Sequence, residues 1–229
     1  MKVEIHSHTN VYSGCSQIPP RELIGMAEAA GYDALFLTDH NRVWSPRELA
    51  GIREWSTRIR VFPGIEVSLP SRVDLLILGT SNPIYETLTT PSDVFAQACT
   101  DGCLTVIAHP FRWCDELPDY CALADAIEVR SCNHPFEEQA EAAREYAEIR
   151  HLAEVYSSDA HGLNFLNRFW LETDEPFTTH EEFRRIILSG RYENRVSDAE
   201  AELPPLYKAS TMDELTEQDR LALLAQPTL

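Results

Sequence analysis

Residues 1–14 read MKVEIHSHTNVYSG, a short alternating stretch that ends in two histidines separated by one serine. Polarity alternates from Lys2 to Ile5, which is typical of a β-strand. Side chains two positions apart in a strand point to the same face, so His6 and His8 converge. Two neutral imidazoles at one point suit a divalent metal, although a lone His-x-His also suits an exposed edge strand. The rest of the chain must decide between these interpretations.

Short apolar runs alternate with helical patterns from this stretch onward. Helix signals occupy residues 20–30 and 136–150, and capping sequences begin at Ser45, Thr90 and Thr179. Such alternation predicts an α/β fold with a mainly parallel sheet, most simply a compact barrel. The candidate strands are residues 3–5, 34–38, 60–66, 74–78, 104–108, 126–129 and 154–157, with a further one at 169–172.

The chain has 229 residues, which suits a single domain. We expect that domain to span residues 1–197. Residues 198–229 change character, being acidic and broken by prolines before one more capped helical pattern. They are interpreted as a C-terminal appendage with one helix and no chemistry of its own.

The composition excludes several classes of partner. Thirty-seven acidic residues against nineteen basic ones give a net charge of −18, which argues against bulk nucleic-acid binding. A small anionic substrate remains compatible, because bound cations reverse the local field. No apolar run has the length of a membrane-spanning helix, so no membrane partner is expected. Six cysteines without CxxC spacing, and no signal-peptide layout, predict reduced thiols in a cytoplasmic protein.

Metal-binding residue types recur where the candidate strands end. In a parallel barrel the carboxyl ends of the strands share one edge, and chemistry gathers there. Each such residue alone would be an ordinary polar turn residue, but their coincidence predicts a polynuclear metal site. The strand-end residues are His6, His8, Asp39, His40, Glu66, His109, Glu128, Asp159 and His161.

These motifs together resemble the PHP family, named for polymerase and histidinol phosphatase. The resemblance runs from Met1 to about Val196 and rests on HSHT (6–9), ALFLTDHN (34–41), PGIEVS (63–68), IAHPFRW (107–113), AIEV (126–129) and SSDAHG (157–162). It implies a distorted seven-stranded β/α barrel. It also implies hydrolysis of phosphate esters with two or three divalent metals, Mn²⁺, Fe²⁺ or Zn²⁺.

The resemblance also implies a role for each ligand. His6, His8, Glu66 and Asp159 would hold the first metal, with Glu66 bridging to the second. His109 would bind the second metal together with a ligand from the sixth strand, and His40 and His161 would hold a third.

Two positions stay open. The sixth-strand ligand varies in the family among histidine, cysteine and glutamate. Glu128 is the first candidate because it alternates inward if its neighbours pack on helices, and Cys132 is the alternative. Cys15 stands where many relatives carry an aspartate or histidine for the third metal. It could bind as a thiolate, which would favour zinc, or leave that position empty.

The predicted reaction is attack on phosphorus by metal-activated hydroxide, with Glu66 at its centre. His40, His161 or Asp39 could assist the leaving group, although Asp39 more simply orients a ligand. Substrate phosphate could be held by three arginines, each of which could equally form a surface salt bridge. These are Arg112, Arg130 and Arg168.

Three function classes compete. The favoured one is a phosphoesterase acting on a small soluble substrate, with a monoester preferred over the diester of a phosphodiesterase. The second is an amidohydrolase-like metal hydrolase. Against it, no lysine stands at a strand end to form a carbamylated bridge, because the only lysines are Lys2 and Lys208. The third is a non-catalytic metal-binding or partner-binding module, which would be expected to lack ligands that this chain has.

Overall fold

The computed structural model describes residues 1–133, 136–162 and 165–197. The predicted C-terminal appendage, residues 198–229, lies outside the described residues. Among the described residues, none of the helices combines the length and apolar character needed to cross a bilayer.

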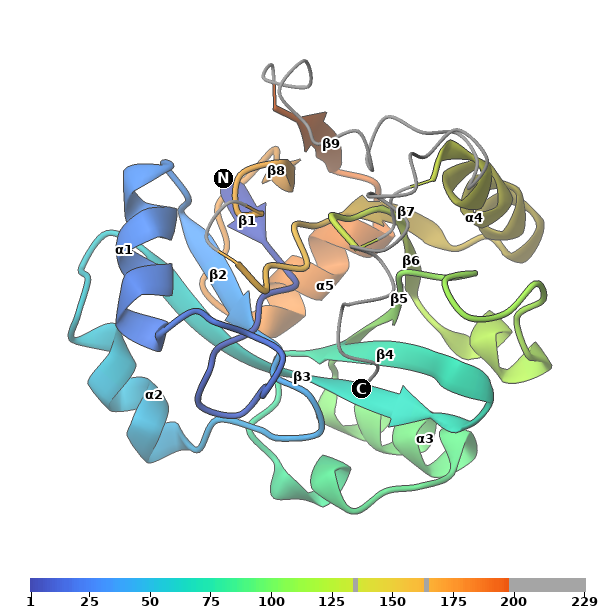
Figure 1. Cartoon of the computed structure of the whole chain (residues 1–229), viewed down its shortest axis with the longest axis horizontal. Helices are drawn as coiled ribbons and strands as arrows, with labels where there is room; N and C mark the ends of the chain where they lie inside the picture. The colour runs from blue at the N-terminus through green and yellow to red at the C-terminus, as the bar shows by residue number, and fades with distance from the viewer. Residues whose placement is uncertain (134–135, 163–164, 198–229) are drawn as a thin grey trace, which may run out of the picture.

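Nine strands form one curved sheet in this part of the chain, in the order β7-β6-β5-β4-β3-β2-β1-β8-β9 (Figure 1). The α/β class is confirmed, but the expected count of seven strands is wrong. The strands are β1 (Lys2–Glu4), β2 (Ala34–Leu37), β3 (Arg60–Leu69), β4 (Val73–Leu78), β5 (Leu104–Ala108), β6 (Ala126–Arg130), β7 (Ala153–Tyr156), β8 (Phe169–Thr173) and β9 (Tyr192–Val196).

Strand direction determines which residues share an edge of the sheet. β1, β2 and β3 are mutually parallel, as are β5, β6 and β7, while β4 runs antiparallel between β3 and β5. The carboxyl ends of six strands therefore lie at one edge, together with the amino end of β4. β8 pairs antiparallel with β1 and with β9.

The barrel is nearly closed between β1 and β7. Beyond the strand ends, Ser7 forms a parallel bridge with Ala160, so the carboxyl edge is joined by backbone hydrogen bonds. At the other edge β8 and β9 are inserted. There Tyr192 Oη and Asn194 Nδ2 donate to the Glu154 carbonyl at 2.7 and 3.0 Å. The insertion accounts for the two strands beyond the expected seven.

β9 was not expected because its residues alternate between half-buried and exposed without an apolar run. The helices match the capping sequences better. Ser45 and Thr179 each complete a capping box, and the Thr90 side chain accepts from the Asp93 N–H. The helices are α1 (Pro20–Ala29), α2 (Pro46–Arg53), α3 (Pro91–Asp101), α4 (Glu137–Arg150) and α5 (His180–Leu188), with short 3-10 turns at Pro70–Arg72, Pro83–Glu86 and Asp119–Leu123.

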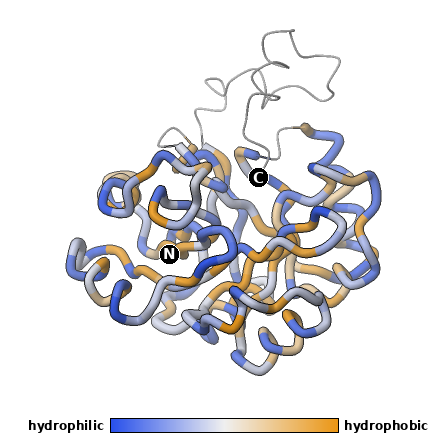
Figure 2. The backbone as a smooth tube through the Cα atoms, turned by 60° about the horizontal axis from the view of Figure 1, so that its bottom comes forward, coloured by the Kyte–Doolittle hydropathy of each residue, from blue (hydrophilic) through white to orange (hydrophobic). Residues whose placement is uncertain are grey.

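The two ends of the barrel differ in polarity. Phe183, Ile186 and Ile187 of α5 join the apolar cluster formed by inward strand residues such as Phe36 and Val106. In Figure 1 this helix lies behind the centre of the sheet, and Figure 2 shows hydrophobic residues recurring along the strands and helices. The apolar filling leaves the carboxyl edge of the strands for polar side chains.

Candidate metal centre

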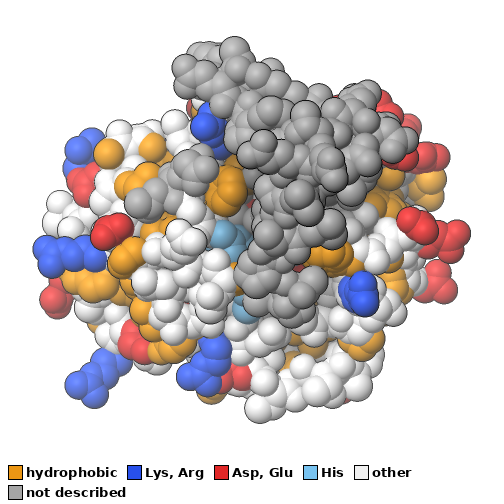
Figure 3. Space-filling model, viewed as in Figure 1, with side chains coloured by type: hydrophobic (Ala, Val, Ile, Leu, Met, Phe, Trp, Pro, Cys, Tyr) orange, Lys and Arg blue, Asp and Glu red, His pale blue; other side chains and the backbone are white. Residues whose placement is uncertain are grey.

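The predicted strand-end residues do come together at the carboxyl edge. The side chains at the ends of β1, β3, β5, β6 and β7 are buried, and His40 and His161 retain 14% and 15% side-chain exposure. Figure 3 shows histidine side chains reaching the surface near the middle of one face of the molecule. The cluster is therefore internal but open to solvent on one side.

Glu128 fixes the orientation of His6. His6 Nδ1 lies 2.9 Å from Glu128 Oε1, an oxygen that also accepts from the Ser157 hydroxyl. The other oxygen, Oε2, accepts the His109 backbone N–H at 2.7 Å. Because an ionised carboxylate only accepts, His6 Nδ1 carries a proton, and Nε2 is the nitrogen left to bind a metal.

Ser13 fixes His8 in the same way. The Ser13 hydroxyl donates to Asp39 Oδ1 at 2.6 Å, so its oxygen is left to accept. It accepts the His40 backbone N–H at 3.0 Å and faces His8 Nδ1 at 3.1 Å. His8 therefore carries its proton on Nδ1, and its Nε2 is a bare lone pair.

Four atoms that can bind a metal meet at one point. His6 Nε2 and His8 Nε2 are 2.9 Å apart, and each lies 3.2–3.4 Å from Glu66 Oε2 and 3.3 Å from Asp159 Oδ1. Neither carboxylate oxygen accepts a well-aligned hydrogen bond from the described residues, although both are buried. Such an arrangement is repulsive unless a metal ion or a second proton on His6 lies among the four atoms, and two nitrogens with two oxygens suit a divalent transition metal.

Both carboxylates stay ionised despite their burial. Burial alone would raise the pKa of Glu66, but His40 and His6 hold it well below its usual value. The same holds for the pKa of Asp159, which burial would raise and His6 and His161 lower. Positive charge must therefore be present beside them, as protons on the histidines or as metal ions.

A second group contains a residue that the sequence did not indicate. Glu66 Oε1 lies 3.0 Å from His109 Nε2, and an Asp74 carboxylate oxygen lies within 4.8 Å of both side chains' ligand atoms. Burial and then the charge of Glu66 raise the pKa of Asp74. A polar residue in the otherwise apolar run VDLLIL was the available signal. Asp74 could not be recognised as a candidate ligand without knowing that β4 is antiparallel, because this direction places the start of β4 at the carboxyl edge of the other strands.

The predicted sixth-strand ligands lie differently. Both carboxylate oxygens of Glu128 accept hydrogen bonds, one from His6 and Ser157 and the other from the His109 backbone N–H. Cys132 is buried, and its thiol points to the Phe165 carbonyl at 3.5 Å. Neither belongs to the groups of potential ligand atoms found among the described residues.

The third predicted group forms around His8, His40 and His161, whose ring nitrogens lie within 4.8 Å of one another. Cys15 adjoins it. Burial would raise the pKa of the Cys15 thiol, but hydrogen bonds with His161 and His40 lower it to about 7. Asn133, another residue that the sequence did not indicate, donates to Asp159 Oδ2 at 2.8 Å and lies 3.2 Å from His161 Nδ1.

Asp39 orients its neighbours. One oxygen accepts from the Thr9 N–H and the Ser13 hydroxyl, and the other accepts from the Thr9 hydroxyl and Trp44 Nε1, all within 2.9 Å. With four donors on a fully buried carboxylate, Asp39 holds the loop that carries His8 and Ser13 in place.

Backbone strain accompanies two of the candidate ligands. His109 and Asp159 have φ angles of 29° and 45°, which residues other than glycine rarely adopt. Each such conformation costs on the order of 1–3 kcal/mol and persists only where its surroundings enforce it. This positive φ turns each side chain out of the strand path toward the cluster.

The three predicted arginines differ in their surroundings. The charge of Arg112 is close enough to influence His109, and its guanidinium lies 4.8 Å from the centre of the Trp113 ring. Arg130 forms an ion pair with Glu137 of α4. Arg168 acts electrostatically on Cys132. Of the three, Arg112 is the one whose charge reaches a residue of the second group.

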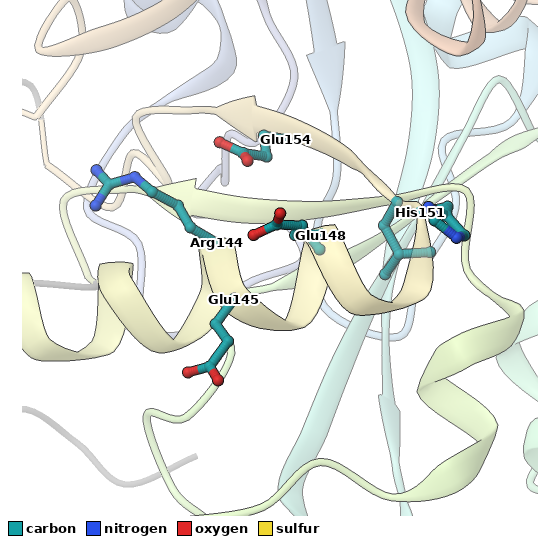
Figure 4. Close-up of a pocket in the computed structure, with 7 residues that line it drawn as sticks. Arg144, Glu145, Glu148, His151 and Glu154 are labelled. Carbon is teal, nitrogen blue, oxygen red and sulfur yellow. The ribbon is translucent and has the colours of Figure 1, made fainter.

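A separate hollow of about 700 Å³ lies between α4 and the start of β7 (Figure 4). Its lining includes Glu145, Glu148 and Glu154, and it contains none of the clustered residues. Its acidic lining does not suit an anionic substrate, and we assign it no part in the site.

Residues 137–192 match the family model described as PHP-associated. No curated protein sequence matches the chain. Three solved structures with the same fold each share 18% sequence identity with it.

One is a two-domain protein from Bacteroides vulgatus containing a predicted PHP-like metal-dependent phosphoesterase (TM-score 0.67, 86% of this chain). The present chain spans 64% of that protein's length. Another is a candidate metal-dependent phosphoesterase from Bifidobacterium adolescentis (TM-score 0.56, 80% of this chain and 94% of that one).

A third is an amidohydrolase from Chromobacterium violaceum, solved with bound sulfate and no metal (TM-score 0.59, 87% of this chain and 100% of that one, 18% identity). At such low identity these neighbours establish the fold alone. Residues 137–192 are thus similar to the PHP-associated family, and the PHP-like neighbours share the fold of this chain.

Proposed function

We propose that the protein is a metal-dependent hydrolase of phosphate esters that acts on a small soluble substrate. The observation that carries the proposal is the convergence of His6 Nε2, His8 Nε2, Glu66 Oε2 and Asp159 Oδ1. Both imidazoles are oriented with Nε2 inward by hydrogen bonds at Nδ1, and both carboxylate oxygens lack a well-aligned hydrogen bond. The PHP-associated match and the PHP-like phosphoesterase neighbours support hydrolysis as the reaction class.

The donor set determines what the centre can do. Divalent ions held there would supply hydroxide near neutral pH and offset charge on a substrate phosphate. Mn²⁺, Fe²⁺ and Zn²⁺ all suit mixed nitrogen and oxygen ligands. Glu66 would bridge two ions, a role supported by one oxygen facing His6 and His8 while the other faces His109.

His40 and His161 lie at the open side of the cluster, where a leaving group would depart. Burial would lower the pKa of each ring, but Glu66 raises that of His40 to about 11 and Asp159 raises that of His161 to about 10. Without metal both rings are protonated at neutral pH and can donate to a leaving alkoxide. With Cys15 as a thiolate, they would instead hold a third ion.

The preferred charge of the substrate depends on whether His40 and His161 hold protons or a third ion. A third cation at His40, His161 and Cys15 would favour the dianion of a monoester, and we propose the monoester as the preferred substrate. Protonated His40 and His161 without that cation would suit a diester. Arg112, whose charge reaches His109, would bind a phosphate oxygen at the second group.

The experiment compares p-nitrophenyl phosphate with its bis-ester under added Mn²⁺, using the wild-type protein and Cys15→Ala. We expect faster monoester cleavage that is lost with chelator and weakened by Cys15→Ala. Faster diester cleavage, unchanged in the variant, would reject the monoester and the third ion. Absence of phosphate release from either ester at saturating metal would reject the phosphoesterase itself.

The Chromobacterium violaceum neighbour gives the second candidate function, hydrolysis of an amide or other C–N bond. Within the described residues the single lysine, Lys2, lies at the start of β1, at the edge opposite the cluster. A carbamylated lysine bridge is therefore not formed by that part of the chain. Cleavage of an acyl p-nitroanilide but not of phosphate esters would favour this alternative.

A further inference from the structure

A further protein ligand beside Glu66 and His109 would complete the second group, and among the described residues β6 does not present one. Glu128 Oε1 accepts from His6 and Ser157, and Oε2 accepts from the His109 N–H. Turning either oxygen toward a metal would break the hydrogen bond that fixes the His6 tautomer or the one that holds the His109 backbone. The carboxylate is fully buried, so water cannot replace those bonds.

The fourth strand presents a carboxylate at the required place. Asp74 is paired with Ser68 on β3 and with Ala108 on β5. Ala108 directly precedes His109, and Glu66 lies two residues before Ser68, on the same face of β3. Asp74 is thus flanked on its two neighbouring strands by the two other members of the group.

The side chains converge as the register requires. One Asp74 oxygen, one Glu66 oxygen and one His109 ring nitrogen all lie within 4.8 Å of one another. A single ion at ordinary metal–ligand distances can reach three atoms so spaced after small side-chain rotations. Glu66 is fully buried, and two carboxylates side by side repel unless a cation lies between them.

We propose that Asp74 is a direct ligand of the second divalent ion, together with His109 and the bridging Glu66, and that Glu128 is a positioning residue. The inference rests on the proposed metal centre and specifies its composition. Two carboxylates and one imidazole form a harder donor set than the histidines and thiol around His40. The second position should therefore accept Mn²⁺ readily, while a thiophilic ion such as Zn²⁺ would prefer the position beside Cys15.

The test is titration of metal-free protein with Mn²⁺, followed by electron paramagnetic resonance and by elemental analysis after desalting. In the wild type we expect a spin-coupled pair. Asp74→Asn should lose one Mn²⁺ equivalent and show an isolated six-line signal in place of the coupled one. Asp74→His, which restores a ligand, should recover the pair. Glu128→Gln should keep the pair at saturating Mn²⁺, and Asp174→Asn, an exposed substitution of the same kind, should match the wild type.

Circular dichroism and thermal melting establish that each variant is folded. A coupled pair that persists in Asp74→Asn with unchanged Mn²⁺ affinity would overturn the inference and leave the proposed metal centre standing. Loss of the pair in Glu128→Gln at saturation, with Asp74→Asn intact, would assign the ligand to β6 instead. A wild type that binds no Mn²⁺, Fe²⁺ or Zn²⁺ would overturn both the inference and the proposed function.

Discussion

Replacing Glu128 by glutamine should weaken metal binding without removing a binding position. The glutamine side chain has one carbonyl oxygen and one NH₂ group, whereas Glu128 accepts with both oxygens. If the oxygen faces His6, the NH₂ group opposes the His109 N–H. If the oxygen faces His109, the NH₂ group faces His6 Nδ1 and drives the ring proton to Nε2, the atom that should bind the ion.

Either outcome has a calculable size. Loss of a partner that orients a metal ligand typically costs 10–100-fold in affinity, or about 1.4–2.7 kcal/mol. In metal-free protein, one buried donor left without an acceptor costs about 1–3 kcal/mol of stability. Competition with a metal-binding dye measures the affinity, and urea unfolding measures the stability.

Glu145→Gln is the matched control, because Glu145 is exposed on α4 and belongs to none of the candidate metal-binding groups. We expect the control to match the wild type in both assays. Unchanged affinity in Glu128→Gln would refute the tautomer argument. Loss of one whole metal equivalent at saturation would show instead that Glu128 is a ligand.

Three further predictions concern the loop and the open side of the cluster. Asp39→Asn should lower the free energy of unfolding, measured with urea, by about 1–3 kcal/mol, because an amide cannot accept from all four donors. Unchanged stability would refute this role of Asp39. Protons on His40 and His161, whose pKa values are raised to about 11 and about 10, must leave when metal binds. Apparent affinity should therefore rise as pH increases toward those values, with proton release in calorimetry, and a pH-independent affinity would contradict it. Cys15→Ser should reduce Zn²⁺ binding more than Mn²⁺ binding, measured by dye competition, and equal losses would remove the thiolate from the third group.

The cluster at the carboxyl edge could be predicted from the sequence because it depends on local patterns. Alternation places His6 and His8 on one face, and parallel strands bring their carboxyl ends to one edge whatever the details of closure. The capping sequences at Ser45 and Thr179 are equally local, and both form as predicted.

The remaining features depend on non-local pairing. Asp74 lies in the cluster because β4 runs antiparallel to its neighbours. The sequence of residues 73–78 does not indicate the direction of the strand. Glu128 points inward as predicted, but whether an inward carboxylate binds metal or orients a histidine depends on distances to three other segments. β9 is a polar edge strand whose pairing comes from β8, so its own sequence carries little strand signal.

The central claim is that the imidazoles and carboxylates at the barrel edge hold catalytic metal ions. The most direct measurement is elemental analysis of purified wild-type protein beside the double variant His6→Ala/His8→Ala, with folding of both verified by circular dichroism. The account predicts at least two transition-metal equivalents in the wild type and loss of metal in the double variant, because both Nε2 ligands are gone. Metal content that is unchanged in a folded double variant would contradict it.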